Sequence, residues 1–100
     1  MNNKKIFISG RVSGIKYDTA KRNFSKWEKY WKEQGYEVVN PIKLCNKDWS
    51  WLKCMCVCLW NLIKCDSTFF MGNYIYSKGS RIELFVARLF RKDIWEQDYK

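Results

Sequence analysis

Residues 77–83 read Ser77-Lys78-Gly79-Ser80-Arg81-Ile82-Glu83 and stand between an apolar run and a helical pattern. The run before them, Ser67-Thr68-Phe69-Phe70-Met71-Gly72, predicts a buried strand that ends in a glycine. The residues after them, Ile82 to Arg91, predict a helix because their apolar side chains recur at helical spacing. A small, hydroxyl-rich loop between strand and helix is where an α/β protein presents backbone N–H groups to an anionic ligand.

Two interpretations of Glu83 stay open at this point, and they do not exclude each other. In the first, the carboxylate lies one turn into the helix and faces whatever the preceding loop binds. In the second, Ser80 and Glu83 form a capping box, with Ser80 as the N-cap and Glu83 at the third helical position. Such a cap would stabilise the helix by only ~1 kcal/mol.

The first half of the chain predicts a parallel pair of strands. Lys5–Ser9 is rich in β-branched and aromatic residues, and Tyr36–Asn40 is a second strand that Pro41 ends. Between them, Thr19–Glu33 is an amphipathic helix with Asp18 or Thr19 as its N-cap. Strand, helix and strand in close succession form a right-handed unit, so the two strands should be parallel.

The second half predicts a loop at 41–48, a helix at Trp49–Lys64, a third strand after Cys65-Asp66 and a short last strand at 92–95. We therefore expect an α/β fold: a three-layer sandwich in which a parallel sheet of about four strands, in the order 2-1-3-4, is flanked by helices. Residues 1–100 should form a single domain. This order would place the loop after Gly10 beside the loop at Ser77.

The glycine-containing turn Gly10-Arg11-Val12-Ser13-Gly14 follows the first strand. It lacks the glycine spacing of a dinucleotide-binding loop and the Gly-Lys-Ser/Thr ending of a P-loop. At the carboxyl end of a strand it can still bind a phosphate or a sugar, with the Arg11 guanidinium as donor.

The composition excludes several classes of site. There is no histidine, so any acid, base or nucleophile must be a carboxylate, a thiol, a lysine or a tyrosine. The net charge is +9, and the helix at Thr19–Glu33 presents lysines and an arginine on its outer face. We interpret this face as solvated surface and consider nucleic acid an unlikely partner, because no groove-reading motif accompanies it.

The five cysteines are Cys45, Cys54, Cys56, Cys58 and Cys65. An odd number leaves one unpaired in any disulfide scheme, so we expect reduced thiols in a reducing compartment. We expect no metal, because alternate cysteines from Cys54 to Cys58 on a helix point in diverging directions. With no apolar run approaching ~20 residues and no signal-peptide pattern at the start, a cytoplasmic protein without membrane partners is expected.

With these elements placed, the chain resembles the nucleoside 2-deoxyribosyltransferase superfamily, and within it a small uncharacterised bacterial and phage branch. The resemblance extends from residue 5 to about residue 94. It rests on Lys5-Ile6-Phe7-Ile8-Ser9-Gly10 with Gly14, on Gly35-Tyr36-Glu37-Val38-Val39-Asn40-Pro41, on Cys65-Asp66 and on Ser77-x-Gly79-x-x-x-Glu83.

The resemblance implies an N-glycosidase or deoxyribosyltransferase that acts on a nucleoside or nucleotide and needs no cofactor. Glu83 matches the glutamate that attacks the anomeric carbon of the sugar, and a serine at Ser77 resembles the branch that accepts 5′-monophosphates. The candidate catalytic residue is Glu83. The candidate substrate-binding residues are Ser9, Gly10, Arg11, Gly14, Asp66, Tyr74, Ser77, Gly79 and Ser80.

Three positions depart from the family pattern. Phe7 stands where a tyrosine usually positions the nucleophile, Cys58 where an aspartate assists departure of the base, and Arg11 where a proline is common. The alternative is therefore a non-catalytic protein of the same fold that binds or sequesters a nucleotide.

The family is often oligomeric, and the helix at Trp49–Lys64 has a wider apolar arc than one sheet face covers. We expect a homodimer or higher homo-oligomer formed through it.

Overall fold

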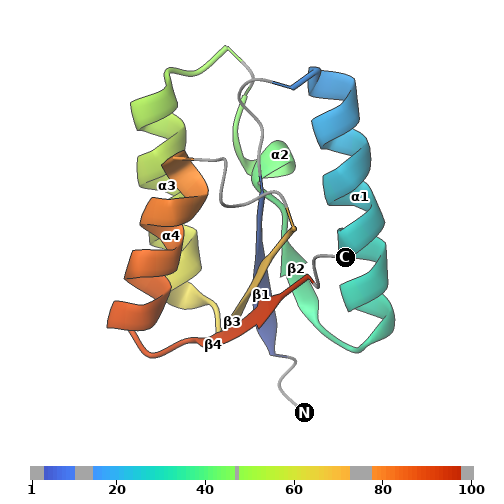
Figure 1. The fold of residues 1–100 in the computed structure, drawn as a ribbon, viewed down its shortest axis with the longest axis vertical. Helices are drawn as coiled ribbons and strands as arrows, with labels where there is room; N and C mark the ends of the chain where they lie inside the picture. The colour runs from blue at the N-terminus through green and yellow to red at the C-terminus, as the bar shows by residue number, and fades with distance from the viewer. Residues whose placement is uncertain (1–3, 11–14, 47, 73–77, 98–100) are drawn as a thin grey trace.

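A computed structural model describes residues 4–10, 15–46, 48–72 and 78–97 of the chain. It contains four strands and four helices within these residues, as Figure 1 shows. In chain order they are β1 (Lys5–Ser9), α1 (Tyr17–Glu33), β2 (Glu37–Val39), α2 (Pro41–Leu44), α3 (Trp51–Lys64), β3 (Ser67–Phe70), α4 (Lys78–Leu89) and β4 (Asp93–Glu96).

The four strands form one parallel sheet in the order β2-β1-β3-β4, which confirms the predicted topology. In the central pair, Ile6 is opposite Ser67 and Ser9 is opposite Phe70, so all the strands run in the same direction. Helix α1 lies on one side of the sheet, and α3 and α4 lie together on the other (Figure 1). The α/β sandwich is therefore as expected, and its topological switch point lies between β1 and β3.

Alternate residues of β1 supply the two halves of the core. Ile6 and Ile8 point toward α1 and pack with Phe24, Trp31 and other large side chains. Phe7 points to the opposite face and joins a cluster contributed by α3, the residue after it and α4: Cys58, Leu62, Cys65 and Ala87. This alternation is the two-residue period of a strand that is buried on both faces.

Several predicted boundaries are wrong in detail. Helix α1 starts at Tyr17 with Lys16 at its N-cap, so neither Asp18 nor Thr19 caps it. The predicted loop after Pro41 contains the short helix α2, because the Asn40 side chain accepts a hydrogen bond from the Ile42 N–H and Pro41 suits a first helical turn. Gly35, with φ +92°, takes the left-handed conformation expected of a glycine after a helix.

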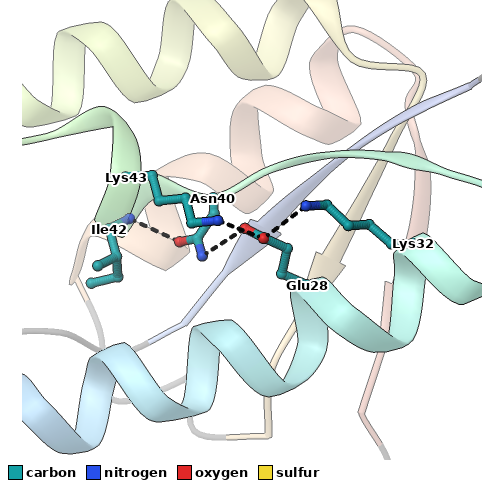
Figure 2. Close-up of polar contacts among 5 residues, drawn as sticks. All are labelled: Glu28, Lys32, Asn40, Ile42 and Lys43. Carbon is teal, nitrogen blue, oxygen red and sulfur yellow. Dashed lines mark hydrogen bonds and ion pairs between the residues drawn. The ribbon is translucent and has the colours of Figure 1, made fainter.

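A buried carboxylate ties α1 to α2 (Figure 2). Glu28 accepts hydrogen bonds from Lys43 Nζ at 2.7 Å, from Lys32 Nζ at 3.1 Å and from Asn40 Nδ2 at 3.1 Å. Burial alone would raise the pKa of Glu28, but these hydrogen bonds outweigh it and hold the pKa below its ordinary value. The network fixes the carboxyl end of β2 and so the position of Pro41, which lines the cavity described below.

Among the residues that the structure describes, we find no helix with both the length and the apolar composition needed to traverse a bilayer.

Candidate functional site

A cavity of about 90 Å³ lies at the carboxyl end of β1, beside the first turns of α4. Ser9 and Gly10 come to it from β1, and Gly79, Ser80 and Glu83 come from α4. The remaining described lining residues are Phe24, Pro41, Trp51, Cys54, Met55 and Cys58. The cavity is therefore at the switch point of the sheet, where α/β proteins bind their ligands.

The polar groups in this cavity are joined by hydrogen bonds. Ser9 Oγ donates to Glu83 Oε1 at 2.5 Å and lies 2.8 Å from Ser80 Oγ. Since a serine hydroxyl carries a single hydrogen, the Ser80 hydroxyl donates to Ser9 when Ser9 donates to the carboxylate. All three side chains are buried. The last residue of β1 thus holds the carboxylate of α4 in place.

Burial changes the acidity of Glu83. The side chain is 6% exposed, and this burial raises its pKa to about 7, although the hydrogen bond from Ser9 acts in the opposite direction. A carboxyl group with such a pKa exists in both protonation states near neutral pH. Burial in a cleft together with a raised pKa is typical of catalytic carboxyl groups.

The capping-box interpretation is wrong. Helix α4 begins at Lys78, so Ser80 is inside the first turn and is not the N-cap. Its hydroxyl is hydrogen-bonded to that of Ser9 at the end of β1. Of the two interpretations left open by the sequence, the position of Glu83 agrees with the first, in which the carboxylate faces a cavity.

Gly10 packs closely against the side chain of Met71. A Cβ atom at this position would lie 2.9 Å from Met71 Sδ, which is nearer than ordinary contacts allow. Gly79 lines the cavity with Gly10, as the sequence predicts. Four further candidate residues, Arg11, Gly14, Tyr74 and Ser77, lie outside the described residues.

Asp66 is not brought to this cavity. Its carboxylate accepts a hydrogen bond from the Lys5 backbone N–H at 2.9 Å, at the beginning of β1. It directly precedes β3, and the cavity lies where the strands end, roughly 13 Å away at ~3.3 Å per residue. The Asp66 carboxylate therefore lies at the amino end of the sheet, away from the cavity.

Of the three positions that depart from the pattern of the resemblance, Phe7 and Cys58 are in the described residues and Arg11 is not. Phe7 is fully buried two residues before Ser9 and on the same face of β1. Cys58 lines the cavity, and its pKa is raised to about 12, first by burial and then by the negative charge of Glu83. A thiol with this pKa is a weak acid, so Cys58 replaces an aspartate poorly as a proton donor.

The expectations for the cysteines are wrong in two respects. Cys45 and Cys54 form a disulfide, so the thiols are not all reduced. Cys54 and Cys58 also do not diverge, since their sulfur atoms lie 3.8 Å apart. Residues four apart share a helix face, so the spacing of Cys54 and Cys58 indicates that their thiols lie close together. A comparison of alternate cysteines misses this. Cys56, between them, is exposed.

A second, wider groove of about 470 Å³ opens on the α1 side of the sheet. It is aromatic: Trp27, Tyr30, Trp31, Tyr36, Phe69 and Trp95 line it with Gln34, Glu96 and Gln97. These rings already contact one another edge-on or tilted, as Trp31 does with Tyr36 and Phe69. None of the candidate site residues within the described part of the chain lines this groove.

Comparison with known proteins places the whole fold in one family. Residues 4–96 match the family described as Domain of unknown function (DUF4406). No curated protein matches the sequence. The matched segment runs from the start of β1 to the end of β4 and includes Ser9, Ser80 and Glu83. The chain therefore belongs to the DUF4406 family.

Proposed function

We propose that this protein is a nucleoside or nucleotide N-glycosidase, or a deoxyribosyltransferase-like enzyme, with Glu83 as its nucleophile. One observation carries the proposal: a buried carboxyl group, hydrogen-bonded by Ser9, faces a cavity at the switch point of a parallel sheet. The resemblance to the nucleoside 2-deoxyribosyltransferase superfamily, in which the matching glutamate attacks the sugar, supports it.

The chemistry suits a site without histidine. The ionised Glu83 attacks the anomeric carbon, the bond from that carbon to the base nitrogen breaks, and the base takes both electrons of the bond together with a proton from solvent. The resulting sugar ester on Glu83 is then attacked by water or by a second base, which releases the carboxylate again. Ser9 binds one carboxylate oxygen and leaves the other available for attack.

The size of the cavity limits what it holds. Ligand pockets usually measure roughly 300–1,000 Å³, whereas this cavity measures about 90 Å³. Only the reacting part of the sugar would lie beside Glu83, and the base would lie toward the open mouth. Gly79 and Ser80, in the first turn of the twelve-residue helix α4, are placed where a helix N-terminus favours an anion such as a 5′-phosphate.

A second candidate, a non-catalytic protein that binds or sequesters a nucleotide, is favoured by Phe7 and Cys58. Phe7 has no hydroxyl to orient the carboxylate, and the raised pKa of Cys58 makes it a poor donor to the leaving base. A carboxyl group with a pKa near 7 can hydrogen-bond a sugar hydroxyl without any bond being cleaved.

Release of free base from a panel of nucleosides and 5′-monophosphates, followed by liquid chromatography, separates the two candidates. An enzyme releases base, and Glu83→Gln abolishes this release while calorimetry still detects ligand binding, because the amide keeps the shape but forms no ester. Glu33→Gln, at the exposed end of α1, is the matched control and should behave as wild type.

If the wild type binds a nucleotide but releases no base at any pH, the non-catalytic candidate is correct. In that case Phe7→Tyr with Cys58→Asp, which restore the family hydroxyl and acid, should give measurable base release. If neither wild type nor these variants bind any nucleoside or nucleotide, both candidates are wrong.

A further inference from the structure

Three cysteine sulfur atoms converge at the edge of the cavity. Cys45 follows α2, and Cys54 and Cys58 lie one turn apart on α3. Cys45 and Cys54 form a disulfide, and Cys58 Sγ lies 3.7 Å from Cys45 Sγ and 3.8 Å from Cys54 Sγ. The three sulfur atoms lie within 4.8 Å of one another. Nothing in the proposed glycosidase chemistry uses this cluster.

Disulfide exchange does not account for this arrangement well. A thiolate attacks a disulfide sulfur along the line of the S–S bond, and Cys58 would have to approach from one end of that bond. Cys58 Sγ is instead almost equidistant from the two bonded sulfur atoms, so it lies beside the bond. A sulfur atom in this position can bind one common atom, such as a metal ion, together with the other two sulfur atoms.

We propose that, once the disulfide is reduced, Cys45, Cys54 and Cys58 form a three-thiolate binding site for a zinc-like divalent cation. In tetrahedral zinc sites the metal–sulfur distance is about 2.3 Å, which places neighbouring sulfur atoms ~3.8 Å apart. The two distances from Cys58 to the other sulfurs, 3.7 and 3.8 Å, already have this value.

The sulfur atoms of Cys45 and Cys54 can reach this separation only after their disulfide is reduced. A dithiol supplies two electrons and two protons, which convert the Cys45–Cys54 disulfide into two thiols, and the dithiol itself becomes a cyclic disulfide. The cation then displaces one proton from each of the three thiols. Cys54 and Cys58 are fixed on α3, whereas Cys45 lies on irregular chain between α2 and α3 and can move away to the required distance.

The fourth coordination position faces the cavity. Cys54 and Cys58 both line the cavity that Glu83 also lines, so the remaining position of a cation held by these sulfurs would be open to it. Three protein ligands with a fourth position open to water are characteristic of zinc sites that act on a ligand, whereas structural zinc sites use four protein ligands. The site would therefore bring a cation and its bound water into the cavity that contains Glu83.

Titration with Co²⁺ tests the proposal directly, because thiolate-bound tetrahedral Co²⁺ absorbs strongly in the near ultraviolet and in the visible. The full chain is reduced under argon with a water-soluble phosphine, which becomes the phosphine oxide, and excess reductant is removed. We expect reduced wild type to bind one Co²⁺ with both absorptions, and Zn²⁺ to displace it. Unreduced protein should show neither absorption.

Single substitutions identify the ligands. Cys58→Ser leaves the disulfide cysteines in place and should weaken Co²⁺ binding at least about tenfold, as should Cys45→Ser. Cys56→Ser is the matched control, because Cys56 is exposed on the same helix between Cys54 and Cys58 and should have no effect. Circular dichroism confirms that each variant is folded.

Reduced wild type without thiolate–Co²⁺ absorption would overturn the proposal, as would equal binding by the wild type and Cys58→Ser. Loss of binding in Cys56→Ser would do the same. These outcomes do not depend on whether Glu83 cleaves a glycosidic bond, so the metal proposal and the proposed function can fail separately.

Discussion

The two faces of the sheet bury different kinds of side chain. On the α1 face, Ile6, Ile8, Phe24 and Trp31 form an apolar cluster extended by partly buried aromatic rings. The other face also has an apolar cluster, with Phe7, Leu62 and Ala87, but the buried residues of α4 include Ser80 and Glu83, and α3 adds the thiol of Cys58. The first face stabilises the fold by removing apolar surface from water. The second retains buried polar groups whose hydrogen bonds and charge states depend on the cavity they surround.

The largest effect we expect comes from disrupting the α1 face. Phe24→Ala removes a fully buried ring and should lower the free energy of unfolding by about 3–5 kcal/mol, because the cavity left behind collapses only in part. Phe85→Ala is the matched control, since Phe85 on α4 is 67% exposed, and should change it by less than about 0.5 kcal/mol. Urea denaturation measures both, and equal effects would contradict the assignment of Phe24 to the core.

The second prediction concerns pH and the other face. The carboxyl of Glu83 ionises near its ordinary pKa of 4.5 in the unfolded chain and only at about 7 in the folded chain. Its contribution to stability is therefore present at low pH and is lost as the pH rises through 7, by roughly 3 kcal/mol at most. The absence of histidine leaves this range free of other side chains with ordinary pKa values there.

Urea denaturation between about pH 4 and pH 8, with a chelator and the disulfide intact, checks this. Cys58, the titratable thiol that acts on Glu83 from α3, has a pKa of about 12 and stays neutral over this range. Wild type should lose stability relative to Glu83→Gln as the pH rises. Parallel curves for the two proteins would show that Glu83 is not held in a desolvated environment.

The third prediction uses Glu28, a buried carboxylate with the opposite shift. Hydrogen bonds from Lys43, Asn40 and Lys32 hold its pKa below 4.5 despite burial, so its contribution is present above that value and is lost as the pH falls through the lower folded pKa. Glu28→Gln should cost about 1–3 kcal/mol near neutral pH, because it breaks charged hydrogen bonds from two lysines. This cost should shrink in acid, whereas Glu83→Gln should become more stable than wild type as the pH rises.

The sequence predicted the sheet better than it predicted the site. Lys5–Ser9 and the order 2-1-3-4 follow from local patterns and chain handedness, and both are confirmed. The apolar spacing that identifies α4 marks a side that is partly solvent-exposed, including Phe85 and Leu89, while the buried side carries Ser80 and Glu83. Hydrophobic periodicity assumes that buried residues are apolar, and a site built on polar burial violates that assumption.

The sequence also does not indicate which residues far apart in the chain come into contact. Nothing local in the sequence indicates that Ser9 reaches Glu83, or that Cys45 meets Cys54 and Cys58, because these contacts depend on how β1, α3 and α4 are arranged around the sheet. The misplacement of Asp66 has the same origin. The sequence places Asp66 just before the third strand, and its assignment to the site came from the resemblance. The hydrogen bond from the Lys5 N–H shows its carboxylate at the amino end of the sheet, away from the cavity.

The last prediction has the smallest expected effect on the fold and concerns the outer side of α3. Leu52 and Trp60 of α3 are 66% and 61% exposed in the single chain, which is unusual for large apolar residues on one helix. We expect a second copy of the chain to cover them, so the protein should be a dimer at micromolar concentration. Leu52→Lys should shift it toward the monomer in light scattering, because a charge buried in an apolar contact is costly.

The free energy of unfolding of the single chain should change by less than about 0.5 kcal/mol, since Leu52 contributes little to either core cluster. Lys29→Ala, on the exposed face of α1, should leave the mass unchanged. A wild-type monomer, or a dimer that Leu52→Lys does not weaken, would mean that this side of α3 faces solvent. The two faces of the sheet would then differ only in the residues that they bury.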